Sequence, residues 1–461
     1  MKPIRGTMMR RLTMSAAILL AGTTGALSET LTDALIKAYN NSQLLEQNRA
    51  LLRAADEGVA QSVAALRPVL AFVADASIQN VSPSPTFGNS TNTSASISLQ
   101  ASMDLYDGGN NRLAIEGAKE SVLSTRAQLL GLEQNVLLSA VVSYNTLRSA
   151  TENLRLAQSN VRLSAEQLRA ARDRFEVGEV TRTDVSQAES ALARAQSQEV
   201  SARGSVLQAQ EAYRAEIGGL PSNLMGVPRV PQLPNSLDAA RKLAQRNHPT
   251  ITAAQHDVAA AEILVSRAKT TLGPSVTGTA GLSAGDTGRS SASLSLQLQQ
   301  TLYAGGALKS ALRQASANRD AARSSLLRST QIVEQGVGDA WTGLAVARAQ
   351  IEATDKQIRA AQLAFDGTRE EARLGARTTL DVLDAQQDLL DAQTARVDAE
   401  AALFNSYYVV LQSVGLLTVD HLGLGIPTYD PAAYYNAVKT APVRSVQGEK
   451  LDRIMKSLGK N

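Results

Sequence analysis

The sequence predicts a mainly α-helical fold of the α+β class, built from two copies of one structural unit. Long stretches of the chain carry apolar residues every seven positions, a period typical of packed long helices. Shorter stretches alternate apolar and polar residues, which indicates strands. The glycine turn at Gly178 recurs 197 residues later at Gly375. A repeat at fixed offset indicates an internal duplication, so one elongated body is expected.

The composition excludes several classes of function. The 461 residues include no cysteine, which excludes disulfides, thiolate catalysis and cysteine metal sites. Aromatic residues make up only 3% of the chain, whereas alanine, leucine, glutamine, serine and arginine are abundant. This balance favours long packed helices over the core of a compact enzyme.

Residues 1–28 have the three parts of a secretory signal peptide: a basic start, an apolar run and a small-residue exit. The mature chain is expected to begin near Glu29. Removing the signal takes four basic and no acidic residues from the 46 and 43 of the full chain, which leaves a net charge of about −1. Nucleic-acid binding needs a basic face, so no nucleic-acid partner is expected.

The first unit, residues 29–218, is expected to open with a helix and a strand hairpin. The hydrophobic pattern predicts a helix over 32–66, a strand over 72–79, a polar loop over 81–93 and a strand over 96–105. Pro68 ends the helix, and two glycines after the second strand allow an abrupt change of direction.

A long helical hairpin completes the first unit. Its first helix is expected from Asn111 to about Phe175 and, at 1.5 Å per residue, would be roughly 100 Å long. Its seam pairs a bulky row with a small row: Leu147, Leu154, Val161, Leu168 and Phe175 with Ala150, Ala157, Ser164 and Ala171. Gly178 can take the positive φ that ends a helix, and Thr183 or Asp184 is expected to cap the returning helix over 184–217.

A linker over residues 219–235 leads into the second unit, residues 236–417, where the same elements recur. The pattern predicts a helix over 236–271, two strands around residues 276–282 and 294–298, and a second long hairpin that turns at Gly375. Residues 418–461 form a tail with three prolines and no sustained period, which we expect to be partly packed and partly disordered.

The strands point to a membrane barrel shared between chains. In lipid only helices and closed barrels satisfy the backbone, and a barrel needs about eight strands. Four strands per chain are too few, so several copies must contribute, and three copies would supply about 12 strands. A soluble sheet packed on one face is the alternative, and the scarcity of aromatic residues near the strands favours it slightly.

Charged residues gather at the second turn, which lies far from the strands. Asp381 and Asp384 are three residues apart and share one helical face, so in a ring of chains they would form a ring of carboxylates that selects cations. The alternative is that Asp381 caps its helix and Asp384 is solvated. Arg377 is placed to bridge to Thr183 or Asp184 of the neighbouring hairpin.

With these features in place, the chain resembles the TolC family of outer-membrane channel proteins over residues 32–417. The most specific matches are the two turns and the Leu-Tyr-x-Gly-Gly runs that begin at Leu105 and Leu302. The resemblance implies a homotrimer with a shared 12-stranded outer-membrane β-barrel and a long α-helical barrel of coiled-coil hairpins in the periplasm. It implies the exit duct of tripartite multidrug efflux or type I secretion, with no cofactor and no enzymatic activity.

The resemblance also implies partners and site residues. The partners would be a periplasmic adaptor protein, an inner-membrane efflux or ABC transporter, and outer-membrane lipid. Asp381 and Asp384 match the carboxylate ring of the periplasmic gate, and Arg377, Thr183 and Asp184 match the links that keep it closed. The helix tips that meet the adaptor would be Val177, Gly178, Glu179, Leu374, Gly375 and Ala376. Ala372 stands where some relatives carry a tyrosine that adds a gate link, so a looser gate is expected.

Three other functions compete with the duct. A passive porin or adhesin would share the signal and strands but would not need such long helices. A soluble coiled-coil scaffold would separate from membranes on fractionation. A secreted enzyme finds no support, because His248, His256 and His421 show no catalytic or metal-binding pattern and are expected to be ordinary surface residues.

Overall fold

The computed structural model describes residues 29–81, 90–221, 224, 226, 230–286 and 288–457. The signal peptide predicted over 1–28 lies outside these residues. So do most of the predicted loop over 81–93, parts of the linker over 219–235 and the last four residues of the tail.

The two halves of the chain contain the same elements in the same order. The first half has α1 (Leu31–Asn41), α2 (Gln43–Ala64), β1 (Val69–Val81), β2 (Ser90–Tyr106), α3 (Asn110–Glu176) and α4 (Arg182–Ile217). The second half has α5 (Leu237–Asn247), α6 (Pro249–Thr270), β3 (Ser275–Gly285), β4 (Ser290–Gln299), α7 (Ala307–Arg373) and α8 (Thr379–Val414). Corresponding helices have equal lengths of 11, 22, 67 and 36 residues. The predicted internal repeat is confirmed.

Each half begins with two short helices, so the single helices predicted over 32–66 and 236–271 are wrong. Ser42 is extended, and its hydroxyl oxygen accepts a hydrogen bond of 3.3 Å from the Leu45 N–H, which starts α2. His248 occupies the equivalent position, and its Nδ1 accepts a bond of 3.2 Å from the Thr250 N–H. Both residues end one helix and cap the next, and Pro249 reinforces the second break.

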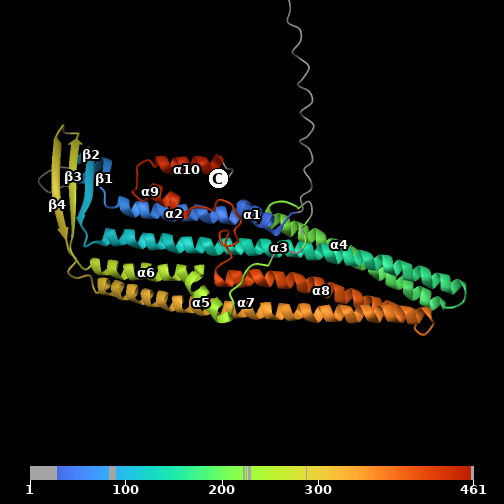
Figure 1. Cartoon of the computed structure of the whole chain (residues 1–461). Coiled ribbons are helices and arrows are strands. Elements are labelled where there is room, and N and C mark those ends of the chain that lie inside the picture. The colour runs from blue at the N-terminus through green and yellow to red at the C-terminus, as the bar shows by residue number, and fades with distance from the viewer. Residues whose placement is uncertain are drawn as a thin grey trace, which may run out of the picture.

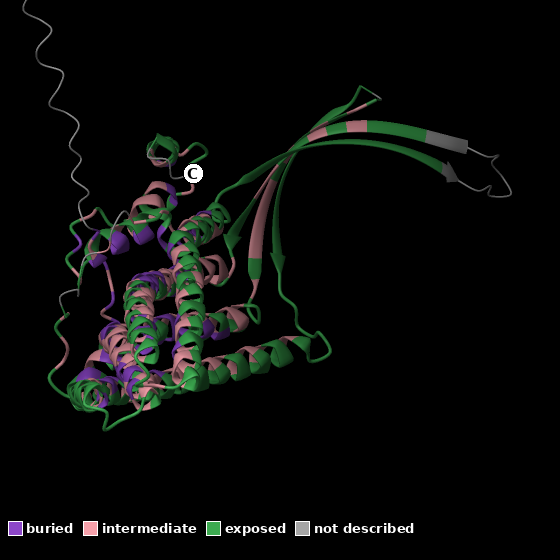
Figure 2. Cartoon of the chain, turned by 90° about the vertical axis from the view of Figure 1, so that its right-hand side faces the viewer, coloured by how far each residue is buried: buried purple, intermediate pink, exposed green. Residues whose placement is uncertain are grey.

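The four strands form one antiparallel sheet in the order β1-β2-β3-β4. The predicted hairpins are present, and β2 pairs with β3 to join the two halves. Phe72 lies opposite Leu99, and Leu99 lies opposite Leu282, so one face is apolar. The other face carries hydroxyls, such as those of Ser77 and Ser94, which are 2.9 Å apart. Most strand residues are exposed in the single chain (Figure 2), and Phe72 and Leu282 of the apolar face are among them.

The main core lies where the short helices meet the long hairpins. Tyr144, Leu137 and Tyr213 are fully buried there against α1. A second cluster repeats this packing in the other half, around Val337 and Val410. Burying large apolar side chains from several helices holds the short helices against the long ones.

The tail contains two helices that the sequence did not reveal, α9 (Pro431–Val438) and α10 (Val446–Ser457). α9 packs on α2, and α10 packs on α9 (Figure 1). With only 8 and 12 residues, these helices are too short to produce a sustained hydrophobic period.

The molecule is elongated, with the sheet at one end and the α3–α4 and α7–α8 turns together at the other (Figure 1). Among the described residues, no helix combines the length and the apolar character that a membrane span requires.

Candidate functional site

The two hairpin tips have the same local structure, and its sequence determinants are clear. Gly178 and Gly375 adopt φ values of 81° and 80°, a conformation that side chains other than glycine rarely take. Thr181 and Thr378 cap the returning helices, where each threonine hydroxyl accepts a hydrogen bond from the backbone N–H three residues later. The glycine turns are as predicted, but the expected cap at Thr183 or Asp184 is wrong because Thr181 takes that position.

Asp184 and Asp381 complete the capping boxes at the third helical position. Asp381 Oδ2 accepts hydrogen bonds of 2.9 Å from both the N–H and the hydroxyl of Thr378. These bonds hold the pKa of Asp381 below its usual range, and bonds from Thr181 act in the same direction on the pKa of Asp184. Both carboxylates are therefore charged near neutral pH and fixed to the first turn of their helices.

Asp384 lies one turn further along α8 and is exposed. Asp388 and Asp391, which sequence reasoning missed, continue the same row at spacings of four and three and are also exposed. The equivalent positions of α4 are Gln187, Ala191 and Arg194, so only the second hairpin carries this acidic row. The heptad spacing of the aspartates was the signal that would have revealed it.

Arg377 lies at the second tip, but within the chain it contacts neither Thr183 nor Asp184. Its Nε donates a hydrogen bond of 3.0 Å to Glu371 Oε2 in the same hairpin. Thr181 engages the carboxylate of Asp184. The link from Arg377 to the neighbouring hairpin thus stays a prediction, and a partner for it would have to come from rearrangement or from another copy of the chain.

The tip residues expected to meet an adaptor are accessible. Val177 and Leu374 are 71% and 75% exposed, which is unusual for large apolar side chains on a helix end. Gly178, Glu179, Gly375 and Ala376 are exposed beside them.

A groove of about 610 Å³ separates α3 from α7 just above these tips. Charged residues of both signs line it: Glu166, Arg174, Asp366, Arg369, Glu370 and Arg373. Arg174 bridges the two sides by donating a hydrogen bond of 3.3 Å to the carbonyl of Ala372. Ala372 is buried here, so the small side chain leaves the backbone carbonyl open to the arginine.

The seam between the two hairpins, where α3 packs against α8, carries polar contacts beside the apolar packing of Tyr408 and Leu411 in the main core. Hydrogen bonds between amide and carboxylate side chains cross it: Gln412 to Asn135 at 2.7 Å, Asn145 to Asn405 at 2.7 Å, Asn153 to Asp398 at 3.1 Å and Gln386 to Asn160 at 2.6 Å. Gln386 is only 5% exposed and also donates to Ser164 Oγ at 3.0 Å.

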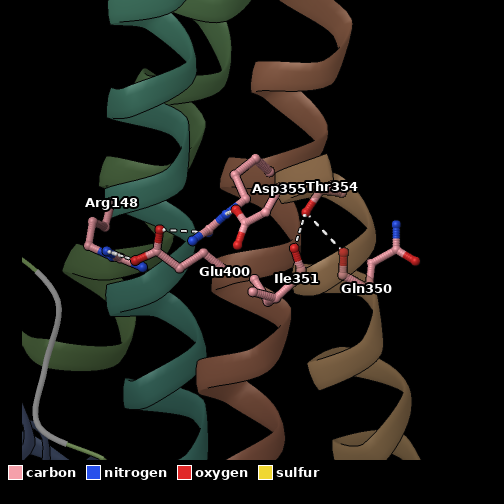
Figure 3. A network of polar contacts seen from close by, with 7 residues as sticks. Arg148, Gln350, Ile351, Thr354, Asp355 and Glu400 are labelled. Carbon is pink, nitrogen blue, oxygen red and sulfur yellow. Dashed lines mark hydrogen bonds and ion pairs between the residues drawn. The ribbon is translucent and has the colours of Figure 1, made fainter. Parts of the chain in front are cut away.

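Ion pairs reinforce the middle of this seam, as Figure 3 shows. Arg148 on α3 forms an ion pair of 3.0 Å with Glu400 on α8. Arg396, also on α8, forms one of 3.3 Å with Glu400 and one of 2.6 Å with Asp355 on α7. Thr354, which is buried, bonds the carbonyls of its own helix instead. The network therefore connects three of the four long helices.

The seams inside each hairpin are mainly apolar by contrast, although the Arg396–Asp355 and Arg172–Glu189 ion pairs also cross them. Phe365, Ala372, Val382 and Leu389 pack between α7 and α8, and Leu168, Ala171 and Ala188 pack between α3 and α4. Separating an apolar seam exposes apolar area to water, whereas water can replace the hydrogen bonds of a polar one. Each hairpin is therefore the stable unit, and the seam between hairpins is the weaker contact.

Two of the three histidines have structural contacts that the sequence did not predict. His256 Nδ1 lies 2.8 Å from Glu120 Oε2, and His248 is the half-buried cap of α6, where burial lowers its pKa. Only His421 matches the expectation of an exposed side chain. In the described part of the chain, no three His, Asp or Glu side chains come together as a metal site.

Comparison with known proteins agrees with this architecture. The family model described as outer membrane efflux protein matches residues 34–219 and 240–415. The chain is 37% identical over 437 residues to the outer membrane efflux protein BepC of Brucella suis, covering 92% of this chain and 95% of the relative. It is 25% identical to the outer membrane protein TolC of Vibrio cholerae, over 78% of this chain and 84% of that protein.

A solved structure of CusC, described as forming a transmembrane channel, has the same fold. It superposes with a TM-score of 0.76 at 18% sequence identity, covering 84% of this chain and 92% of CusC.

Proposed function

Because the chain belongs to the outer membrane efflux protein family, and so acts as an efflux channel component of the outer membrane, we propose that three copies assemble into the exit duct of a tripartite pump. The observation that carries the proposal is the placement of a two-faced sheet at one end and two equivalent helical tips at the other.

The assembly of three copies is supported by unpaired edges in the sheet and in the row of long helices. β1 and β4 each pair on one side only, so their outer backbone groups are free to pair with the next copy. Three sheets would give about 12 strands, within the range of known barrels. Phe72, Leu294 and Leu296, which are 69%, 86% and 70% exposed, would then face lipid.

The helical part has matching edges. α4 and α7 lie at opposite sides of the row of long helices, since the contacts within the chain run from α4 through α3 and α8 to α7. Val200 and Leu207 on α4 are 69% and 60% exposed, and Val346 on α7 is 61% exposed. Contact between α4 of one copy and α7 of the next would bury these side chains and close a helical tube.

An adaptor protein is the partner we propose for the tips. The groove between α3 and α7 is open at the end of the molecule, and its mixed charges suit a partner with arginine and carboxylate side chains at a helical tip. An inner-membrane efflux or ABC transporter would act through that adaptor. Because solutes would pass along the duct unchanged, we assign the chain no catalytic activity and no cofactor.

Gating would take place at the tips. In a ring of three chains Asp381 and Asp384 would form a carboxylate ring, and Arg377, Thr183 and Asp184 would supply the links that hold the entrance closed. The α7–α8 hairpin can move as one body, because its own seam is apolar while its contact with α3 is polar.

The test is conductance and ion selectivity of the purified protein in a planar bilayer, for wild type and for the Asp381→Ala, Asp384→Ala double variant. We expect a cation-selective pore in the wild type and a clear loss of selectivity and of divalent-ion block in the variant. A pore that the variant leaves unchanged contradicts the gate assignment. The absence of any pore contradicts the duct and favours a coiled-coil scaffold.

A further inference from the structure

The C-terminal strap, residues 418–457, crosses α2 and is held there mainly through tyrosines. Arg49, which is 2% exposed, lies between the rings of Tyr39 and Tyr429, at 5.1 Å from each centroid. Arg126 on α3 lies 5.2 Å from the centroid of Tyr435. Such cation–π contacts strengthen when the groups are desolvated, so the strap ties α2 to α3.

Polar contacts extend this attachment along the strap. Tyr434 donates a hydrogen bond of 2.8 Å to Glu57, and Arg67 donates one of 2.5 Å to the carbonyl of Ala441. At the far end Arg53 pairs with Asp452 at 3.4 Å. The strap is thus attached from Tyr429 to α10.

A carboxylate on α2, close enough to the strap for its charge to act on Tyr429, is buried without a hydrogen-bond partner. Asp56 is 0% exposed, and neither of its oxygens accepts a hydrogen bond from the described residues. The nearest cation is Arg126, at 3.9 Å between Nη2 and Oδ1, which is too long for a hydrogen bond. Burial raises the pKa of Asp56 to about 6, against the opposing attraction of Arg126.

A second, half-buried carboxylate lies at the start of the strap. Glu133 on α3 accepts a hydrogen bond of 2.9 Å from the Val419 N–H. Burial raises its pKa, and the negative charge of Asp420 adds to the effect, while the Val419 bond and Arg49 oppose it. Glu133 lines a cavity of about 540 Å³ between α2, α3 and the strap, together with Arg49 and Arg126.

The charged groups around these two carboxylates come from every neighbouring element. They are Glu46, Arg49, Arg53 and Glu57 from α2, Arg126 from α3, and Asp420 and Asp430 from the strap. Arg49 pairs with Glu46 and Arg53 pairs with Asp452, whereas Arg126 has its ion pair with Asp56 at 3.9 Å, beyond hydrogen-bond distance. Neither carboxylate therefore has a cation of its own at hydrogen-bond distance.

We propose that the strap is an acid-tightened clamp, whose attachment to α2 and α3 strengthens when the Asp56 and Glu133 carboxylates take up protons. Detaching the strap would admit water to both carboxylates, so the ionised forms favour the detached state and the neutral forms favour the attached one. The sign follows: attachment is strongest below the ordinary aspartate range and weakens as the pH rises through about 6. The strap would thereby stiffen the α2–α3 junction, which lies between the sheet and the hairpins, in acidic surroundings.

Hydrogen exchange of α9 and α10 in the intact protein tests the proposal at pH 5.0 and 7.5. Rates are divided by the intrinsic chemical rate at each pH, so that they report the opening equilibrium of the strap. For a carboxylate with a pKa near 6 when covered and near 4 when open, linkage gives an opening constant about tenfold smaller at pH 5.0. The α4 peptides, far from the strap, serve as an internal reference.

Two variants separate titration from simple loss of contact. Asp56→Asn, combined with Glu133→Gln, should bring the ratio between the two pH values close to one. Asp452→Asn, which removes the ion pair with Arg53, should increase opening equally at both pH values and keep the tenfold ratio. A wild-type ratio near one overturns the proposal without any variant, as does a double variant that retains the wild-type ratio.

Discussion

The side-chain amide of Gln386 on α8 lies 2.6 Å from Asn160 Oδ1 on α3, buried in the seam between the two hairpins. This buried contact is polar, whereas the clusters packed inside each hairpin nearby are apolar. Hydrogen bonds join the hairpins here alongside the packing of Leu163, and water can replace those bonds when the hairpins part.

Replacing Gln386 by leucine should loosen this seam. The change leaves Asn160 Oδ1 and Ser164 Oγ without their donor, and an unsatisfied buried polar group costs about 1–3 kcal/mol. Hydrogen exchange of α3 around residue 160 should accelerate accordingly. A double-mutant cycle with Asn160→Leu provides the control, because the second change should add little once the first is made. Fully additive effects would contradict a coupled pair.

Arg377→Ala should leave the stability of the tip nearly unchanged and raise the resting conductance of the channel. The ion pair with Glu371 is 53% exposed on both sides, and such solvent-exposed pairs contribute little to stability. If Arg377 instead links neighbouring hairpins in the assembled gate, its loss opens the entrance. Arg373→Ala is the matched control, since Arg373 pairs with Glu370 in similar exposure. Equal leakage through both variants would refute a specific gate link.

Asp381 and Asp384 should differ in what they do, because only Asp381 is part of a capping box. Asp384→Asn should lower the cation preference of the pore while the first turn of α8 keeps its protection from exchange. Thr378→Ala should do the opposite, since it removes the cap without changing the charge. Reversal potentials and hydrogen exchange of α8 measure the two effects separately. A loss of selectivity in Thr378→Ala would show that cap and charge cannot be separated.

The tips should be insensitive to pH in the range where the strap responds. Asp184 and Asp381 have lowered pKa values, so their caps are present above the ordinary value of 3.8 and are lost only as the pH falls through the lower folded values. Exchange protection of the first turns of α4 and α8, corrected for intrinsic rates, should therefore be equal at pH 7.5 and 5.0. A change in that interval would point to another titrating group.

Gly375→Ala and Gly415→Ala should have very different effects, although both glycines have positive φ values of 80° and 83°. At Gly375 an added Cβ meets nothing within 4 Å, so the change should cost only the left-handed backbone strain of about 1–2 kcal/mol. At Gly415 the Cβ would lie 2.9 Å from both the Asn247 carbonyl oxygen and His248 Cα. Thermal denaturation should show a much larger loss for Gly415→Ala, and similar losses would contradict close packing at that junction.

Local patterns in the sequence predict the repeat, the strands, the long hairpins and the glycine turns. These features depend on local periodicity and on backbone conformation, which neighbouring residues dictate. The bounds of α3 came within a residue or two of those predicted, because no proline or cap interrupts the helix. The breaks at Ser42 and His248 were missed, although a capping serine and Pro249 stood at those positions, because apolar spacing continued on both sides.

Only the tertiary structure decided which distant side chains meet. The polar seam between α3 and α8 joins residues more than 200 positions apart, and no local pattern fixes that register. The same holds for buried Asp56, whose nearest cation, Arg126, contacts the ring of Tyr435 from the far end of the chain. The packing of whole helices sets which residues meet at such sequence separations. Local patterns therefore predict the hairpin tips, whereas the contacts that hold the hairpins together depend on the tertiary structure.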